Sequence, residues 1–201
     1  MSAVPARRGY TVVEIMISLA ILAIGASGII AMQKVAAVAN RDSKNLVIAN
    51  QIARTWVERL RADATKWNHP SAFLPTSDLG ETEWLKLTPD TVNLTWLRPA
   101  DGVLGSFTAD AFGNDVTPTD PTAAYCTNLR LTWLYGPPSA GVPPPYLIRA
   151  EIRVFWIREG GGGALSGGLC PANMGTAAVD TALANYHFVY VTTALTQNMA
   201  R

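Results

Sequence analysis

The sequence predicts an α+β protein, with one long N-terminal helix packed on a head of mostly antiparallel β-sheet. The first observation is an apolar stretch, Ile15 to Met32, that no charge interrupts. The second is an amphipathic stretch that follows at helical spacing, up to about Lys66. The third is that later segments alternate apolar and polar residues, as strands with one buried face do.

The composition favours a membrane-anchored globular protein. Hydrophobic residues make up 49% of the 201 residues and charged residues 15%, which is too apolar for a disordered chain. The 16 basic and 15 acidic residues nearly cancel. A near-neutral chain lacks the basic patch that nucleic acid requires, so we predict no nucleic-acid partner.

The junction before the apolar stretch combines a basic pair, a small residue and an acid. Arg7 and Arg8 mark the side that stays in the cytoplasm, because cations beside a first hydrophobic segment resist translocation. Glu14 lies at the start of the predicted membrane helix. A charge costs roughly 2.5 to 3.5 kcal/mol at the centre of a bilayer, so an acid there indicates a functional site.

The segment Gly9-Tyr10-Thr11-Val12-Val13-Glu14 resembles the processing motif of type IV prepilins. Ala20 to Gly25, together with Gly28, is similar to PilV-like minor pilins. The resemblance implies that a prepilin peptidase cuts between Gly9 and Tyr10 and methylates the new amino terminus. The sequence differs from the commonest form in having Tyr10 rather than Phe, and from major pilins in having Ala31 where they usually carry proline.

By this resemblance the chain is a minor pilin, a structural subunit that helps prime a type IV pilus and sits at or near its tip. The implied partners are the prepilin peptidase, the inner-membrane assembly platform, other minor pilins, the major pilin, a tip adhesin and membrane lipid. The head is expected to be periplasmic before assembly and at the cell surface afterwards. A pseudopilin of a type II secretion system shares the leader, Glu14 and the helix, and remains the alternative.

Two other interpretations of the N-terminus are weaker. A secretory signal peptide cleaved after Gly25-Ala26-Ser27 does not fit a glutamate inside its core. An ordinary membrane anchor needs about 20 apolar residues, which are present, but it gives Glu14 no role. A membrane-anchored periplasmic enzyme or ligand-binding domain would share that anchor and is the alternative of another class.

Cleavage at Gly9 gives Glu14 a chemical partner, because it exposes an ammonium at Tyr10. Methylation leaves this nitrogen cationic, and pairing across subunits would offset part of the desolvation of both charges. The simpler possibility is that Glu14 only stabilises the positive end of its own helix, worth about 0.3 to 1 kcal/mol.

The helix is predicted in two parts after a leader at residues 1–9. Residues 10–33 form the transmembrane and assembly segment, and residues 34–68 continue it as an amphipathic helix that ends at Asn68 and Pro70. Together they form about 55 residues, or roughly 80 Å. One apolar stripe faces the core: Leu46, Ala49, Ile52, Ala53, Trp56, Val57, Leu60 and Ala64.

The head, residues 69–201, contains four predicted strands. Segments 92–96 and 129–133 alternate apolar and polar residues, and 146–157 does so over its whole length. Segment 186–195 is apolar on both faces, which predicts a central strand. The tryptophans are predicted to be core residues.

Three loops separate these strands, at 98–121, 136–145 and 159–168. The second is rich in proline and the third in glycine. The first carries Asp110, Asn114, Asp115 and Asp120. Calcium takes six to eight oxygen ligands, but the spacing of these four matches no EF-hand, so we expect a solvated loop, with calcium as the weaker alternative.

Cys126 and Cys170 are the two cysteines, and both lie in the exported head, where a disulfide between them is expected to persist. No spacing suggests zinc or a redox site. His69 and His187 are the two histidines, and neither lies in a metal-ligand or nucleophile motif. We therefore expect no enzyme and no cofactor.

Overall fold

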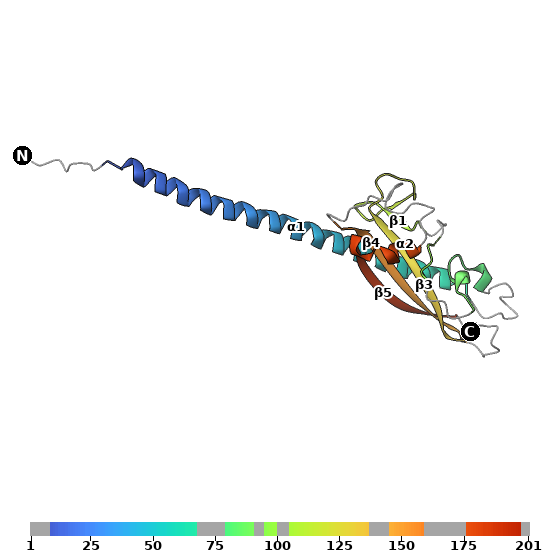
Figure 1. Cartoon of the computed structure of the whole chain (residues 1–201). Coiled ribbons are helices and arrows are strands. Elements are labelled where there is room, and N and C mark those ends of the chain that lie inside the picture. The colour runs from blue at the N-terminus through green and yellow to red at the C-terminus, as the bar shows by residue number, and fades with distance from the viewer. Residues whose placement is uncertain are drawn as a thin grey trace, which may run out of the picture. The chain divides into compact units, whose positions relative to one another are not determined.

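The computed structural model describes residues 9–67, 79–90, 95–99, 105–136, 145–158 and 176–197. The chain divides into two units, residues 1–44 and residues 45–201. Helix α1, Val12–Ala64, contributes to both of them. The elements are shown in Figure 1. The predicted α+β fold is confirmed: the described residues form a long N-terminal helix and a five-stranded antiparallel sheet.

Helix α1 is 53 residues long and ends four residues before the expected position. Its first part is exposed up to Lys44, and an 18-residue window within it has a mean hydropathy of 2.4 with none of it buried. This part is long and apolar enough to cross a membrane. The stripe that faces the core begins only at Ile48, within the second unit.

The predicted core stripe of α1 is confirmed except at its start. Seven of its eight members are buried, whereas Leu46 is 48% exposed and Ile48 takes its place. Asp63 is also fully buried on this stripe, which the sequence did not suggest. The helix therefore contributes one carboxylate to an otherwise apolar contact with the head.

The sheet has the strand order β2-β1-β3-β4-β5, with every pair antiparallel. Strands β3 (Tyr125–Tyr135), β4 (Leu147–Ile157) and β5 (Tyr186–Thr196) are each 11 residues long. Strands β1 (Thr108–Ala109) and β2 (Asp115–Val116) form a short hairpin at the far edge. The central long strands are therefore β3 and β4.

The expectation that 186–195 is a central strand was wrong: in the sheet formed by the described residues, β5 pairs with β4 alone and lies at the edge. Its second apolar face exists for a different reason. Phe188 and Tyr190 stack with each other, and Tyr190 packs against Trp96, so this face gathers aromatic residues from outside the sheet. Apolar residues on both faces indicated side-chain packing here, not a second neighbouring strand.

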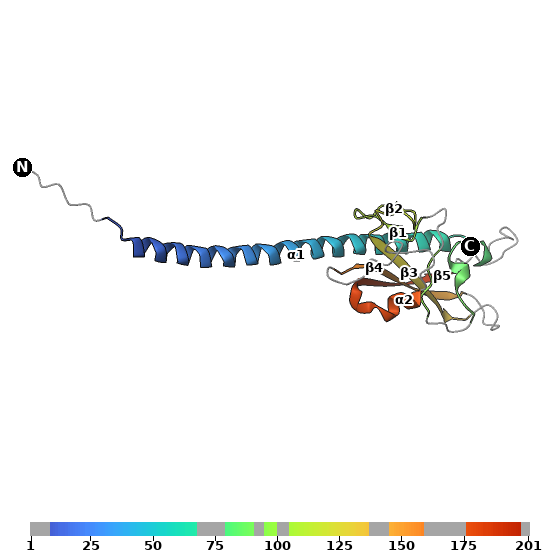
Figure 2. The same cartoon turned by 45° about the horizontal axis from the view of Figure 1, so that its top comes forward.

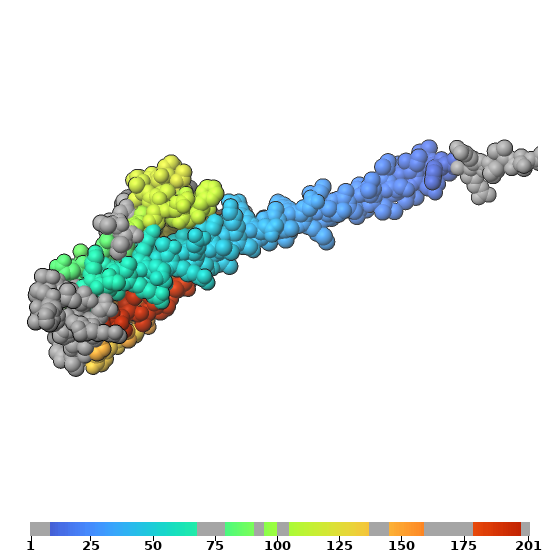
Figure 3. All heavy atoms as spheres, turned by 180° about the vertical axis from the view of Figure 1, so that it is seen from behind, coloured from blue at the N-terminus to red at the C-terminus, as the bar shows by residue number. Residues whose placement is uncertain are grey.

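Different elements pack on the two faces of the sheet, as Figure 2 shows. Tyr125 on β3 donates a hydrogen bond to Asn45, and Trp133 packs edge-on against Trp67, so this face lies under α1. On the opposite face, Arg153 of β4 forms an ion pair with Asp180 of α2 (Thr176–Thr181). Figure 3 shows β5 along one side of α1 and the β1–β2 region along the other.

Two of the predicted segments between the helix and β3 need correction. Thr95 and Trp96 are not in a strand, and the predicted strand 92–96 is represented only by an isolated bridge from Leu97 to Leu129, with residues 91–94 outside the described part. The predicted loop 98–121 contains the β1–β2 hairpin. Short 3-10 helices at Leu79–Glu81, Leu85–Leu87 and Leu183–Asn185 were also not predicted.

The prediction that the tryptophans are core residues is confirmed for most of them. Trp56, Trp67 and Trp84 are at most 1% exposed, and Trp156 is 7% exposed. Trp96 and Trp133 are half-buried against the sheet. Most of loop 136–145 and all of loop 159–168 lie outside the described residues.

Candidate functional site

The helix begins at a threonine cap next to the predicted cleavage point. The hydroxyl of Thr11 accepts a hydrogen bond from the backbone N–H of Glu14 at 3.3 Å, and the Thr11 carbonyl accepts from Glu14 and Ile15. A threonine in this position satisfies N–H groups that the helix leaves without partners. The spacing Thr-x-x-Glu is that of a capping box, in which the glutamate bonds back to the cap.

The Glu14 carboxylate does not complete that box. Within the described residues its side chain is exposed and forms no hydrogen bond or ion pair. Glu14 lies four residues from Tyr10, and its negative charge stands at the positive end of the helix. The charge is thus available to a cation supplied from outside the monomer.

The surface beyond Glu14 is apolar on all sides. Large side chains more than half exposed recur along the helix, among them Ile15, Met16, Ile17, Leu19, Ile21, Leu22, Ile24, Ile29, Ile30 and Met32. Exposed apolar area of this extent is rare in soluble monomers and indicates contact with membrane or protein. Among the described residues no atom lies near the position of a Cβ at Gly25 or Gly28, so no contact within this part of the chain requires their small size.

Residues 5–30 match the model of the prokaryotic N-terminal methylation motif. The motif indicates a type IV pilin-like or pseudopilin-like protein. No curated protein and no solved structure matches the chain. The match spans the basic pair, Gly9, Tyr10 and Glu14, and together with the apolar helix it fits a prepilin anchored in the inner membrane.

The predicted processing residues are accessible where the structure describes them. Gly9 is exposed with open space around its Cα, and Tyr10 is 81% exposed. Both precede the helix, so the bond between them lies outside regular secondary structure. Arg7 and Arg8 lie outside the described residues.

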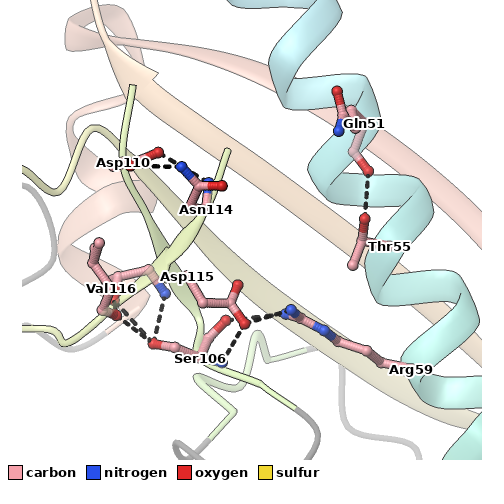
Figure 4. A network of polar contacts seen from close by, with 9 residues as sticks. Gln51, Thr55, Arg59, Ser106, Asp110, Asn114, Asp115 and Val116 are labelled. Atoms are coloured by element: carbon pink, nitrogen blue, oxygen red, sulfur yellow. Dashed lines mark hydrogen bonds and ion pairs between the residues drawn. The ribbon is translucent and has the colours of Figure 1, made fainter. Parts of the chain in front are cut away.

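In the head, an ion pair joins α1 to the β1–β2 hairpin (Figure 4). The Arg59 guanidinium donates to Asp115 and, at 3.3 Å, to the carbonyl of Ser106. Asp115 also accepts from the Ser106 N–H at 3.2 Å. Gly105 has a φ of +147°, and a Cβ there would overlap the Arg59 guanidinium. The glycine therefore makes room for this contact.

A second contact joins the end of α1 to the segment after it. The buried carboxylate of Asp63 accepts hydrogen bonds from the backbone N–H groups of Glu83, Trp84 and Leu85, at 2.6, 2.8 and 3.1 Å. These N–H groups lie at the start of the 3-10 helix Leu85–Leu87, where such donors lack internal partners. Trp84 then packs on Trp56 of α1 with ring centroids 4.9 Å apart.

The face of the sheet under α2 carries a buried cation that the sequence analysis missed. The Arg153 side chain is 1% exposed, pairs with Asp180, donates to Asn128 at 2.9 Å and stacks over Trp96. An arginine at an outward position of an alternating strand gave no signal of burial. The ion pair lets this face pack without leaving the charge unpaired.

The neighbouring ion pair between Arg130 and Glu151 also affects the pKa of the Glu151 carboxyl. The hydrogen bond from Arg130 is the main cause that lowers the pKa of Glu151, and burial opposes it. Cross-strand register places these two residues opposite each other on β3 and β4. The carboxylate is therefore held ionised at neutral pH in a partly buried position.

The four residues of the weaker calcium alternative have separate roles. Asp115 pairs with Arg59, and Asp120 bonds to Thr122. Asp110 accepts from Asn114 within its own turn, and this hydrogen bond is the main cause that lowers the pKa of Asp110. In the parts of the chain that the structure describes, no group of three or more metal-binding side chains is found. The expected solvated loop and the calcium alternative therefore both stay predictions.

Cys126 is fully buried on β3, opposite Phe155 of β4. Cys170 and His69 lie outside the described residues, so the predicted disulfide stays a prediction. His187 stacks on Trp156 with ring centroids 5.3 Å apart. This histidine has a packing role in the sheet.

Proposed function

We propose that the protein is a minor pilin, a structural subunit that primes a type IV pilus and sits at or near its tip. The observation that carries the proposal is the exposed Glu14 carboxylate, without a partner among the described residues, at the start of an exposed apolar helix that bears the methylation motif. We infer further that processing between Gly9 and Tyr10 creates the missing partner. The ammonium of Tyr10 on one subunit pairs with Glu14 on its neighbour.

The energetics of this pairing make assembly depend on processing. A carboxylate and an ammonium in a low-dielectric environment each lose hydration, and their mutual attraction offsets that loss only when they meet closely. Before cleavage no ammonium exists at Tyr10, so an unprocessed neighbour offers no cation at this position. The exposed apolar surface of the helix supplies the remaining driving force, through contact with other subunits in the filament.

The helix sequence supports a minor rather than a major subunit, because Ala31 stands where major pilins usually carry proline. Its implied partners are other minor pilins, the major pilin, a tip adhesin, the prepilin peptidase and the assembly platform. The second candidate is a pseudopilin of a type II secretion system, which shares Glu14 and the methylation motif. The role is structural in both cases, and neither requires an enzyme or a cofactor.

Glu14 variants test the assembly role. Glu14→Leu should be inserted and cleaved but should not enter filaments, whereas Glu14→Asp, which keeps the charge, should retain part of the incorporation. The measurement is the amount of the protein in sheared filaments relative to the membrane fraction, by immunoblot. If Glu14→Leu assembles like the wild type, the pairing is not what drives incorporation.

Thr11→Val is the matched control, because it removes the capping hydroxyl and leaves the acid in place. Loss of an N-cap costs about 1 kcal/mol of helix stability, close to the value of a charge at a helix end. If Glu14 only stabilises its own helix, Thr11→Val and Glu14→Leu will reduce incorporation equally. The intersubunit role predicts a much larger loss for Glu14→Leu.

A deletion strain separates the two candidate filaments. A minor pilin predicts that surface pili decrease while exoprotein release continues, and that the protein is present in sheared pili. A pseudopilin predicts normal pili and loss of exoprotein release. The second pattern would show that the protein is a pseudopilin and would rule out the minor pilin.

A further inference from the structure

Two charged residues lie at the ends of the exposed apolar part of helix α1. Glu14 lies in its first turn, and Lys34 is the next charged residue along the chain. Residues 15–33 between them are uncharged, and all of them are exposed. After Lys34 the next charge is Arg41. The uncharged surface of the helix therefore has one defined end at Glu14 and another at Lys34.

The distance between these two charges matches the thickness of a bilayer. Glu14 and Lys34 are 20 residues apart on one continuous helix (Figure 1). With a rise of about 1.5 Å per residue, their Cα atoms lie about 30 Å apart along its axis. The hydrocarbon core of a typical bilayer is also about 30 Å thick. Both charges can therefore lie at the boundaries of the core together, whereas a shift by one turn in either direction places one of them in hydrocarbon.

Lys34 has no acid beside it on the helix to neutralise its charge. The residues three and four positions away are all apolar: Ile30, Ala31, Ala37 and Val38. Lys34 is exposed, and within the described residues it takes part in no ion pair. A lysine near the end of an apolar helix extends its ammonium into the headgroup layer. The partner that suits its charge there is a lipid phosphate.

The residue type before Glu14 fits a boundary position at the other end. Tyr10 lies four residues earlier, precedes the helix and is 81% exposed. Tyrosine is enriched at membrane–water interfaces, because its ring is apolar and its hydroxyl is polar. With Glu14 at the edge of the core, the Tyr10 hydroxyl reaches the headgroup layer and stays hydrated. Tyr10 and Lys34 thus support the same depth of the helix from opposite sides.

We propose that Glu14 and Lys34 fix the depth of α1 in the membrane before assembly. Glu14 lies at the cytoplasmic boundary in contact with water, and Lys34 lies at the opposite boundary, paired with a lipid phosphate. The carboxylate then loses its hydration only when the helix enters a filament. Water weakens the attraction between Glu14 and a neighbour's amino terminus until that point. The inference rests on the proposed function, which supplies the filament, and adds to it the lipid contact and the depth of the site.

Cysteine labelling of the full-length protein tests this depth, in cells that lack the assembly platform so that every copy stays in the membrane. Single cysteines replace Val13 and Ile21 toward one boundary, and Ile29 and Val35 toward the other. A membrane-impermeant maleimide reacts with the thiolate, which does not form in hydrocarbon. The reagent is added to inverted membrane vesicles for the cytoplasmic side and to spheroplasts for the other side. Protein without an added cysteine gives the background of the two native cysteines.

The labelling rates locate both boundaries. Val13→Cys should react about tenfold faster than Ile21→Cys from the cytoplasmic side, and Val35→Cys about tenfold faster than Ile29→Cys from the other side. A protected Val13→Cys would place Glu14 inside the hydrocarbon and overturn the inference. A protected Val35→Cys would do the same for the boundary at Lys34.

Lys34→Leu in the Val35→Cys protein tests the lysine itself, with Lys34→Arg as the matched control. Without the charge the uncharged surface continues to Asn40, so residue 35 should enter the core and label about tenfold more slowly. Lys34→Arg keeps a cation that binds phosphate and should label like the wild type. Equal rates for the two variants would overturn the role of Lys34.

The labelling results are separate from the test of the proposed function. If Lys34→Leu does not insert into the membrane, the rates at the four cysteine positions in the wild-type background alone decide. A wrong depth, together with exclusion of Glu14→Leu from filaments, overturns this inference and leaves the proposed function intact. Normal incorporation of Glu14→Leu removes the proposed function, and the inferred step from hydrated charge to filament falls with it.

Discussion

Replacing Asp63 tests whether a single buried carboxylate holds the end of α1 to the head. Asp63→Ala leaves three backbone N–H groups without their acceptor, and two of them belong to Trp84 and Leu85, which are at most 1% exposed. Each buried donor left without a partner costs about 1 to 3 kcal/mol. With the half-buried Glu83 donor added, we expect a loss of about 3 to 6 kcal/mol in the free energy of unfolding.

This loss is large compared with the 5 to 15 kcal/mol that typically stabilises a domain. The assay is urea unfolding of the full-length protein in detergent micelles, followed by tryptophan fluorescence, because Trp84 and Trp56 are in contact. With a slope of about 2 kcal/mol per molar urea, the midpoint should fall by roughly 2 M. Asp63→Asn keeps one acceptor oxygen but loses the charge, so it should lose about 1 to 3 kcal/mol.

Glu58→Ala is the matched control on the same helix. Glu58 is 70% exposed and pairs with Arg61 at the surface, which is worth less than about 1 kcal/mol. The reasoning is refuted if the free energy of unfolding of Asp63→Ala lies within about 0.5 kcal/mol of the wild-type value. It is also refuted if Glu58→Ala destabilises the head as much as Asp63→Ala does.

Three further outcomes are expected. Gly105→Ala should lower the free energy of unfolding by about 1 to 3 kcal/mol, because its φ is +147° and its Cβ would displace Arg59 from Asp115; a calorimetric midpoint equal to the wild type would contradict this. The pKa of Glu151 is lowered in the folded state, so its stabilising contribution is present above its ordinary pKa and is lost as the pH falls through the folded value. Glu151→Gln should therefore show a shallower loss of stability in acid than the wild type, and parallel pH profiles would rule the pair out as a cause. Cys126→Ser should lower the free energy of unfolding by about 4 kcal/mol if a bridge to Cys170 closes the intervening loop, and peptide mapping without reductant should show the two cysteines linked.

Elements with a simple period were predictable from the sequence. The helical stripe from Ala49 to Ala64 and the alternation of β4 both follow from burial of one face, and the structure has both. The motif at Gly9 to Glu14 could also be recognised from the sequence, because its residues are contiguous. Helices, strands and motifs that depend on a local residue pattern can therefore be predicted from a single sequence.

Features that depend on distant residues were not predictable. β5 was misassigned as central because its second face packs aromatic side chains around Trp96 and Arg153, and the sequence does not show that contact. The burial of Arg153 was missed because its acid, Asp180, lies on a different element. The burial of Asp63 could have been predicted, because it lies three residues after Leu60 and next to Ala64 on the core stripe.

The central claim is that Glu14 acts with an amino terminus created at Tyr10, and mass spectrometry of the mature protein tests it most directly. The protein purified from cell membranes or filaments should begin at Tyr10 and carry a methyl group on its α-amino nitrogen. A protein that keeps Met1 to Gly9, or one that begins near Gly28, would contradict the claim, because Glu14 would then have no such ammonium to meet.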